Sequence, residues 1–598
     1  MDDPRPLLAA LGLTVTMLMV AWGVRRSTST TLDFYLASRQ VGPFLNACAI
    51  CGDYFSAASF IGVAGAVYAS GLDGVWFATG FAAGFVIVLL FLAAPLRRAG
   101  HFSIPDFLAN RFSSPSVRLT AVAIVQLVVL LYLIPQLAGA GIIWEVFVGG
   151  GLGGLSPYST GILLSVVAIV IQAVVGGMKG TTWNQALQFG LKMFALFMVT
   201  AFALGHGFSY SEGIGRASER PLGVPTEVSR AEAFEVSAGD KTRLELAQTV
   251  MSKKGYAAAV RKLETGSTKV DLLLPAENRL HPGRELRFME PGFRYSLWQQ
   301  IALIVTLLLG TAGLPHISNR YFTSTSGRAA RLSTVWVLGL AAAFYFFAVL
   351  LGVAARADLP RWLGAGVTDS DFVDSVVRVP EKALLLLTEQ LGGQSLLALV
   401  SAAAFAAIFS TVAGLLLAAA TSWGHDVYEQ FINPAASERR RIRFGQAAVT
   451  LTATLAAAIS LGLPSITASG APSVALMVTW AFALAGSAFT PVFLLGVWWK
   501  RASSTGAMAG MIVGATVSLG FIASELVARA TGWSVSTPIS NFPSIVAAPL
   551  STLAVVGGSL LHTARDDASS WWLRVHGTAL ERRQASLVRL AAKSGRVG

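Results

Sequence analysis

The sequence predicts an all-helical protein that crosses a membrane about thirteen times. Hydrophobic residues make up 54% of its 598 residues and charged residues only 13%, which is far from the balance of a water-soluble domain. The hydrophobic residues fall into recurrent blocks of about 18 to 30, each long enough to cross the hydrocarbon core of a bilayer. A helical membrane bundle therefore explains the length of the chain better than several soluble domains.

Hydropathy places six helices before residue 208 and seven after a polar interval. The first six are expected near 7–24, 44–70, 74–96, 117–148, 157–176 and 182–207. The other seven are expected near 296–316, 331–354, 393–424, 445–463, 472–498, 506–529 and 543–563. The first segment does not have the pattern of a cleaved signal peptide, because Asp2 and Asp3 precede it and Arg25 and Arg26 follow it.

Arginine and lysine are concentrated in the short loops on one side of the predicted bundle. This side carries Arg25, Arg26, Arg39, Arg97, Arg98, Arg111, Arg118, Lys179, Arg320, Arg328, Arg331, Arg439, Arg440, Arg441, Arg443, Lys500 and Arg501. The positive-inside rule assigns these loops to the cytoplasm, with the N-terminus outside and the C-terminus inside. The net charge of +13 is thus a topology signal, because no basic stripe with interleaved aromatic residues indicates nucleic-acid binding.

The predicted organisation has six parts. They are an extra N-terminal helix (1–30), a first repeat of helices 2–6 (31–207), an extracytoplasmic insert (208–295), a second repeat of helices 7–11 (296–500), two C-terminal helices (501–564) and a basic cytoplasmic tail (565–598). The insert is either a decorated loop or a module that gathers substrate or binds a partner. The tail is expected to be solvated or to face lipid headgroups.

No arrangement of residues indicates catalysis, and no catalytic residue is predicted. The two cysteines, Cys48 and Cys51, lie on one face of an apolar helix, which excludes a disulfide framework and favours plain packing. His316 is expected to form hydrogen bonds at a helix end, because the seven histidines show no HExxH or other metal-site spacing.

Two helices are interrupted by residues that a uniformly apolar span would not contain. Helix 2 contains the run Cys51-Gly52-Asp53-Tyr54-Phe55-Ser56-Ala57-Ala58-Ser59, with a carboxylate near mid-membrane. Helix 7 contains Gly310-Thr311-Ala312-Gly313-Leu314-Pro315-His316, in which glycine and proline weaken the helix. Because each run opens a group of five helices, the pair predicts the broken helices of an inverted-repeat secondary transporter. A channel requires no such pairing.

Helices 6 and 9 add polar groups to the same region. Ser410 and Thr411 in helix 9, together with carbonyls freed in helix 2, would complete an oxygen cage for an alkali cation. Gln185, Gln188 and Lys192 share one face of helix 6, which is expected to point into the bundle. Lys192 is a possible proton carrier or fixed cation, although pairing within the bundle is an alternative.

The chain resembles the sodium:solute symporter family in these stretches and in three more. The additional stretches are Gly176-Gly177-Met178-Lys179-Gly180-Thr181-Thr182-Trp183 before helix 6, and Ser401 to Ala406 and Gly424-His425-Asp426-Val427-Tyr428 in helix 9. The resemblance is to the acetate permease or monocarboxylate branch and covers about Leu32 to Val527 without the insert, which departs from the family pattern. It implies a LeuT-like 5+5 inverted-repeat bundle that works by alternating access.

The resemblance also implies a sodium site. Its ligands would be the carbonyls of Gly52, Phe55 and Ala407 and the side chains of Ser410 and Thr411. The substrate pocket would lie beside it and would be lined by Asp53, Ser56, Ser59, Tyr132, Gln136, Thr311 and Gly313. A carboxylate could be held by backbone N–H groups at a half-helix end, without an intramembrane arginine.

The expected function is import of a short-chain monocarboxylate such as acetate, propionate or pyruvate, coupled to Na⁺, in the bacterial plasma membrane. Asp53 and Lys192 are the candidates for coupling if the ion is a proton. The alternatives are a proton-coupled carboxylate symporter, a sodium symporter for another small organic solute and a transporter-like sensor. The expected partners are the small carboxylate and the lipid bilayer; no obligate protein partner or nucleic acid is expected.

Overall fold

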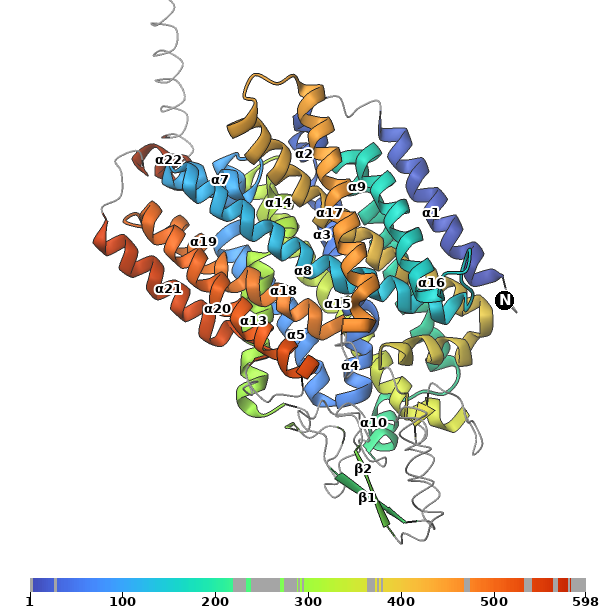
Figure 1. Ribbon diagram of the computed structural model, residues 1–598. Helices are drawn as coiled ribbons and strands as arrows, with labels where there is room; N and C mark the ends of the chain where they lie inside the picture. The colour runs from blue at the N-terminus through green and yellow to red at the C-terminus, as the bar shows by residue number, and fades with distance from the viewer. Residues whose placement is uncertain are drawn as a thin grey trace, which may run out of the picture.

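The computed structural model is a bundle of long helices with a small extension at one end (Figure 1). It describes residues 4–25, 30–218, 295–362, 380–466, 474–531, 540–562 and 568–578, with the short pieces 233–237, 269–273, 288, 291–292, 372–373, 376–377 and 581. Two of the predicted parts, the insert 208–295 and the tail 565–598, therefore lie largely outside the described residues.

The described residues of the first half of the chain form ten named α-helices. They are α1 (Arg5–Val24), α2 (Thr31–Leu36), α3 (Pro43–Tyr54), α4 (Val63–Ser70), α5 (Leu72–Ile87), α6 (Ala93–Ala99), α7 (Ile104–Phe112), α8 (Pro115–Phe147), α9 (Pro157–Gly205) and α10 (Tyr210–Ser218). Short 3₁₀ or π segments join some of them: η2 (Ala37–Arg39), η3 (Ala58–Gly62) and η4 (Val88–Leu92).

The second half begins after the insert. Its helices are α13 (Leu297–Gly313), α14 (Pro315–Phe322), α15 (Gly327–Trp362), η6 (Pro380–Lys382), α16 (Ala383–Thr421), η7 (Ser422–Ile432), α17 (Glu438–Ile466), α18 (Val474–Ala488), α19 (Thr490–Trp498), α20 (Ser504–Thr531), α21 (Ser544–Leu561) and α22 (Ala568–His576). Two antiparallel pairs of strands complete the described elements: β1 (Ala233–Ser237) with β2 (Lys269–Leu273), and β3 (Phe372–Val373) with β4 (Val376–Val377).

Among the described residues, eleven helices are long and apolar enough to cross a membrane, or twelve when the bent pair α3 and α4 counts as one span. Two predicted segments, 157–176 and 182–207, both fall in α9. A straight helix of the 49 residues of α9 would be about 74 Å long, more than twice the hydrocarbon thickness of about 30 Å. The backbone leaves the helical region at Gly177, with φ 53° and ψ −159°, which divides α9 where the prediction placed the boundary. The number thirteen stays a prediction.

Both predicted helix breaks are confirmed. α3 ends at Tyr54, and the helix that resumes after Ser56 is bent from it by 72°. In the second repeat, α13 ends at Gly313 and α14 starts at Pro315, with Leu314 in an extended conformation between them. Proline fits the first turn of α14 because its missing N–H has no partner to lose there.

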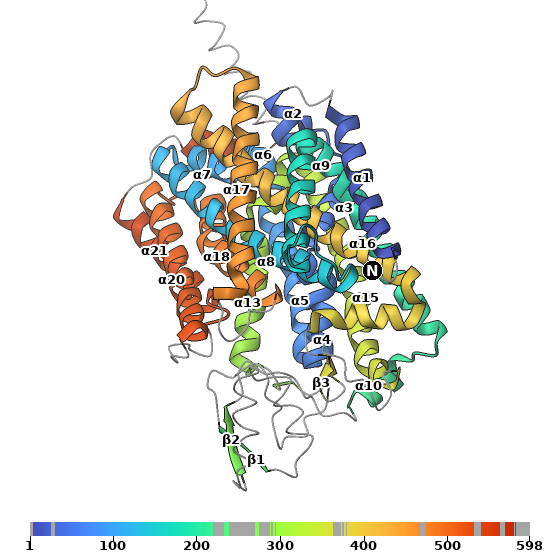
Figure 2. The ribbon, with the colours of Figure 1, turned by 45° about the vertical axis from the view of Figure 1, so that its right-hand side comes forward.

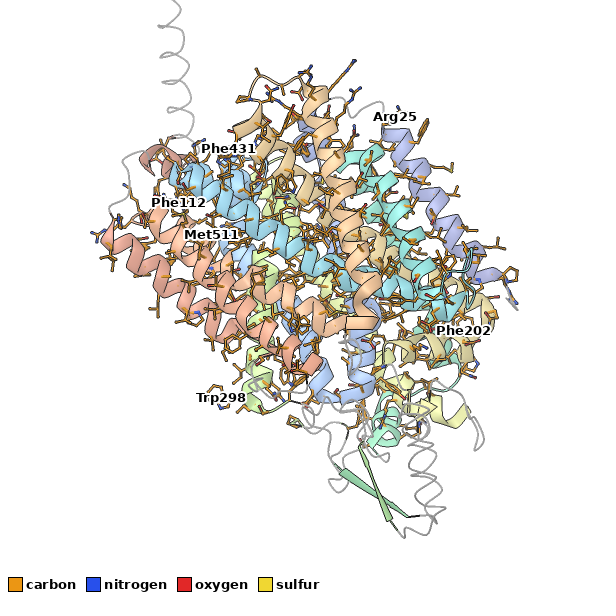
Figure 3. All side chains as sticks on the ribbon, in the orientation of Figure 1. Arg25, Phe112, Phe202, Trp298, Phe431 and Met511 are labelled. Atoms are coloured by element: carbon orange, nitrogen blue, oxygen red, sulfur yellow. The ribbon has the colours of Figure 1, made fainter. Side chains whose placement is uncertain are left out.

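The bundle has a buried centre and an apolar exterior of the kind that faces lipid. In the most apolar window of the span that contains α16, 94% of the residues are buried, and α16 packs against α1, α8 and α9. The pair α20 and α21 and the helix α1 lie at opposite edges in both views (Figures 1 and 2). Large apolar side chains such as Trp298 and Phe202 stand on the outside, where hydrocarbon is expected, whereas Met511 is buried (Figure 3).

The basic loops gather at one end of the bundle, and the described elements of the insert lie at the other (Figure 1). Arg97 donates to the carbonyls of Ser324 and Thr325, and Arg98 donates to the carbonyl of Val575 at 3.1 Å. The elements α2, α7 and α22 share this end, while α10, β1 and β2 extend from the opposite one. This arrangement agrees with the predicted sides; which end faces the cytoplasm stays a prediction.

Three of the arginines assigned to cytoplasmic loops are buried instead. Arg111 and Arg118 are 3% and 8% exposed, and Arg320 is 0% exposed in α14. Their guanidinium groups bond to carbonyls or carboxylates of other helices, so they form part of the packing. The assignment of Arg320 to a loop was wrong, because a charge close to a predicted helix end cannot be distinguished from a loop charge by hydropathy alone.

The start and end of the insert are fastened to the bundle. The carboxylate of Asp73, at the start of α5, accepts hydrogen bonds from the N–H groups of Gly292 and Tyr295 at 3.0 and 3.2 Å. On the other side of the insert, Arg216 of α10 bonds to Asp358 of α15 at 3.0 Å. Both attachments lie at the insert's own end of the bundle.

Candidate functional site

The first break frees backbone carbonyls at the centre of the bundle. Phe55 has φ −79° and ψ 76°, outside the helical region. The N–H of Ser56 therefore bonds to the carbonyl of Tyr54 at 2.8 Å, and the carbonyl of Gly52 loses its helical partner. In the same way, the N–H of Ser59 bonds to the carbonyl of Ser56 at 3.0 Å and leaves the carbonyl of Phe55 available.

A lysine side chain fills the space between these carbonyls. Lys192 Nζ of α9 lies 2.8 Å from the carbonyl oxygen of Gly52 and 2.7 Å from that of Phe55. It also lies 3.3 Å from Oγ of Ser410 in α16. Lys192 is fully buried, so its charge is balanced only by these protein groups and their neighbours.

The hydroxyls of α16 close the other side of the site. Thr411 Oγ1 donates to the carbonyl of Asp53 at 2.6 Å and also lies 3.1 Å from the carbonyl of Ala407. Ser410 Oγ donates to the carbonyl of Ala407 at 3.1 Å. The structure thus brings together the residues predicted as sodium ligands, which we call the cage: Gly52, Phe55, Ala407, Ser410 and Thr411. Neutral oxygens of this kind suit a singly charged cation.

Asp53 forms a buried ion pair that was not predicted from the sequence. Its Oδ2 lies 3.3 Å from Nε of Arg320, and both side chains are shielded from solvent. The opposite wall is Gly414 of α16, where an added Cβ would lie 2.1 Å from Oδ1 of Asp53. Glycine is needed at position 414 because the carboxylate occupies the space of a side chain.

Arg320 connects the ion pair to the cage. Its guanidinium donates to the hydroxyl of Thr182 at 2.8 Å and to the side-chain oxygen of Gln185. The amide nitrogen of Gln185 then donates to the carbonyl of Ser410 at 2.7 Å. The prediction that Gln185, Gln188 and Lys192 face the bundle is confirmed by their burial, and an intramembrane arginine does stand beside the site.

Several predicted substrate residues lie together next to the cage. The ring of Tyr132 packs edge-on against that of His316 at 5.5 Å between centroids, and the hydroxyl of Ser56 is buried without a hydrogen-bond partner among the described residues. The side-chain oxygen of Gln136 accepts from the N–H of Ala57 at 3.3 Å. Within the described part of the chain, the amide nitrogen of Gln136 and both ring nitrogens of His316 are buried without a partner. Buried polar groups left in this state are suited to a polar ligand.

Other predicted substrate residues have protein partners. The hydroxyl of Ser59 bonds to that of Tyr345 at 3.1 Å, and the hydroxyl of Thr311 bonds to that of Tyr54 at 2.6 Å. Gly313 packs so closely that a Cβ would lie 2.3 Å from the carbonyl of Ala485, which indicates a packing role. The roles of Tyr54 and Tyr345 were not predicted, and the prediction that His316 forms hydrogen bonds at a helix end was wrong, because neither ring nitrogen has a partner among the described residues.

A second polar cluster joins α7, α8 and η7 near the basic end. Arg118 donates to Asp426 at 2.8 Å and to Asp106 at 3.0 Å, and Ser103 donates to Asp426 at 2.5 Å. Burial alone would raise the pKa of Asp106, but hydrogen bonds with His101 and His425 outweigh it and hold that pKa far below its usual range. Asp106, His425 and Asp426 have the spacing of metal ligands. The forked guanidinium of Arg118 already binds both carboxylates, which favours a structural role.

Comparison with known protein families agrees with this architecture. The model of the sodium:solute symporter family matches residues 34–225 and 244–514, more than half of the chain. The chain belongs to the sodium:solute symporter family. In this symporter, the match extends into the interval 208–295, which was expected to depart from the family, and between the two matched segments only 226–243 is left out.

Two curated relatives resemble this symporter over nearly their full length. It is 30% identical over 565 residues to the "Uncharacterized symporter YwcA" of Bacillus subtilis, covering 93% of each chain. It is 31% identical over 566 residues to the "Monocarboxylic acid transporter" of Corynebacterium glutamicum, covering 92% of this chain and 90% of the relative. These relatives and the family are transporters, and the symporter is a multi-pass protein of the bacterial plasma membrane.

The fold also matches a solved structure, described as the substrate-bound outward-open state of a Na⁺-coupled sialic acid symporter. The TM-score is 0.63 at 16% identity, with 94% of this chain and 98% of that chain covered. At this identity the likeness concerns the fold alone. The LeuT-like fold predicted for the symporter is confirmed.

Proposed function

We propose that this symporter imports a short-chain monocarboxylate, such as acetate, propionate or pyruvate, by alternating access coupled to Na⁺. The observation that carries the proposal is the cage, in which freed carbonyls of the first break face two hydroxyls of α16. A broken helix at the bundle centre is the usual place for coupling ion and substrate in such transporters. The name of the Corynebacterium relative, a monocarboxylic acid transporter, supports the substrate class.

The substrate carboxylate would lie between the first break and the residues around Tyr132. The amide nitrogen of Gln136 and the ring of His316 supply hydrogen-bond donors that have no partner among the described residues. The aromatic rings of Tyr132 and Phe482, 5.7 Å apart, supply an apolar wall for a short alkyl chain. A donor set of this size suits one carboxylate better than a large polyol.

Proton coupling is the second candidate, and the lysine in the cage is the observation that favours it. If the lysine remains in place, sodium cannot use the same oxygens, and another ion must supply the driving force. Asp53 and Lys192 then become the residues expected to couple transport to protons. A sodium symporter for another small organic solute, or a transporter-like sensor, would share the fold but not the carboxylate selectivity.

Uptake into proteoliposomes tests the proposal. The purified full-length protein is reconstituted, and radiolabelled acetate uptake is measured under an inward Na⁺ gradient or an inward proton gradient, with K⁺ or choline replacing Na⁺. Accumulation driven by Na⁺ and blocked by propionate or pyruvate is expected. Accumulation driven only by the proton gradient would support proton coupling instead of sodium coupling. Absence of acetate uptake under both gradients contradicts the proposed substrate class.

A further inference from the structure

The Lys192 ammonium lies inside the cage assigned to the coupling cation. Its Nζ contacts three of the five predicted ligands, the carbonyls of Gly52 and Phe55 and the hydroxyl of Ser410, at 2.7 to 3.3 Å. The lysine comes from α9, whereas these oxygens come from the first break and from α16. A sodium ion bound to the same three oxygens would need the space that the nitrogen fills.

The hydrogen-bond geometry around this nitrogen suits an ammonium. The two carbonyls can only accept, and the Ser410 hydroxyl gives its hydrogen to the carbonyl of Ala407 at 3.1 Å. Nζ therefore donates to both carbonyls, and an ammonium has a third N–H group for the oxygen of Ser410. As an ammonium, Lys192 places a positive charge in the cage on a covalent tether.

We propose that Lys192 is a tethered competitor of sodium: the ammonium and Na⁺ alternate in one cage, and Na⁺ binds only after the lysine side chain has left. This inference rests on the proposed function, because it assumes that the cage serves the coupling cation. Lys192 then sets the sodium affinity. If the lysine vacates the cage in one molecule of ten, the apparent Kd for Na⁺ is about tenfold above the intrinsic one.

The charges around the site support a single occupant. Lys192 and Arg320 carry two positive charges against the one negative charge of Asp53, so the buried set has an excess of +1. Sodium added beside the lysine would raise the excess to +2 in a region of low dielectric constant, which is strongly unfavourable. With either cation alone, one monocarboxylate substrate brings the sum to zero.

Lysine removal tests the competition without any need for substrate. Lys192→Met keeps the length of the side chain and removes the charge, while Lys192→Gln keeps two N–H donors. The Tm of each purified full-length variant is titrated with NaCl, and KCl at equal ionic strength serves as the reference. We expect the half-saturating Na⁺ concentration to fall about tenfold or more relative to the wild type in both variants. An unchanged or raised value in a folded variant overturns the proposal.

Two controls separate the cage from general effects on α9. Gln188→Met changes a buried side chain one turn earlier, and it should leave the Na⁺ response at the wild-type level. The double variant Lys192→Met with Ser410→Ala lacks one ligand of the cage, and it should lose the increase in Na⁺ affinity expected of Lys192→Met alone. The wild type supplies a test that needs no variant: tight, Na⁺-specific stabilisation at low-millimolar salt would also overturn the proposal.

The two proposals fail in different ways. If Lys192→Met binds Na⁺ more tightly but the wild type takes up no acetate, the result supports competition between Lys192 and Na⁺ and contradicts the proposed substrate class. Acetate uptake by the wild type, with an unchanged Na⁺ affinity in Lys192→Met, retains the transporter and rejects the competition.

Discussion

Arg320 and Asp53 are 267 positions apart in the sequence, yet their side chains meet at 3.3 Å in the centre of the bundle. Asp53 belongs to the helix turn before the first break, and Arg320 belongs to α14, directly after the second break. The ion pair therefore joins the two broken helices to each other. Because both groups are buried, each is stabilised mainly by its partner and by neighbouring hydrogen bonds.

Breaking this pair from one side should be costly. Asp53→Asn or Arg320→Met alone leaves the opposite charge buried without its partner, and we expect a loss of about 3–5 kcal/mol in stability. The double variant should lose less than the sum of the single variants. Thermal unfolding of all four proteins in one detergent measures the coupling, and simple additivity would show that the two charges do not depend on each other.

Gly414→Ala should disturb the same carboxylate from the opposite side. The added Cβ would lie 2.1 Å from Oδ1 of Asp53, so the carboxylate or α16 must move, at a cost of about 1–3 kcal/mol. Gly190→Ala in α9 is the matched control, because a Cβ added at that position would meet no neighbouring atom within 4 Å. The Tm of Gly414→Ala should be lower than that of Gly190→Ala, and equal Tm values would argue against close packing at position 414.

The hydroxyls of the cage should matter more for cation affinity than for stability. Ser410→Ala combined with Thr411→Ala removes two oxygens of the cage, and we expect at least a tenfold loss of apparent cation affinity, about 1.4 kcal/mol. Thr421→Ala in the same helix is the control, because the Thr421 hydroxyl bonds back to the carbonyl of Leu417 one turn earlier. Full cation affinity in the double variant would place the ion elsewhere.

Replacing Arg118 with lysine should lower the stability of the protein. The Arg118 guanidinium binds Asp106 and Asp426 through separate nitrogens, a forked contact that a single ammonium cannot reproduce. Arg118→Met should lose about 3–5 kcal/mol, and Arg118→Lys should recover only part of it. Denaturation measurements that find Arg118→Lys equal to the wild type would contradict the importance of the fork.

The predicted sides of the membrane can be tested with single cysteines. Both native cysteines are first removed by Cys48→Ala and Cys51→Ala. A single cysteine is then introduced at an exposed position of one end, by Ser211→Cys or by Ser437→Cys. A membrane-impermeant maleimide should label position 211 in intact cells and position 437 only after permeabilisation. The reverse labelling pattern would invert the topology.

The sequence predicted the breaks well because their causes are local. Glycine, proline and polar residues in the runs around Phe55 and Leu314 weaken a helix wherever the chain folds, and both positions break. The cage was predicted through family resemblance, and the structure brings its five residues together. Helical spacing also placed Lys192 on the inward face of α9.

The partners of the buried charges could not be predicted in the same way. Spacing gives the face of a helix that a side chain occupies, but it does not give the depth to which that side chain reaches or the group that it meets. The contact of Lys192 with Gly52 and the contact of Arg118 with Asp426 join residues 140 and 308 positions apart. Such contacts depend on how whole helices pack.

The two fastenings of the insert give it a practical use. Asp73 holds the returning chain and Arg216 holds the departing one, so each end of the insert has its own attachment to α5 or α15. Protein engineers can treat that stretch as a cassette. Replacing residues 219–287 with a rigid soluble domain would give this largely lipid-embedded molecule a landmark for particle alignment in electron cryo-microscopy.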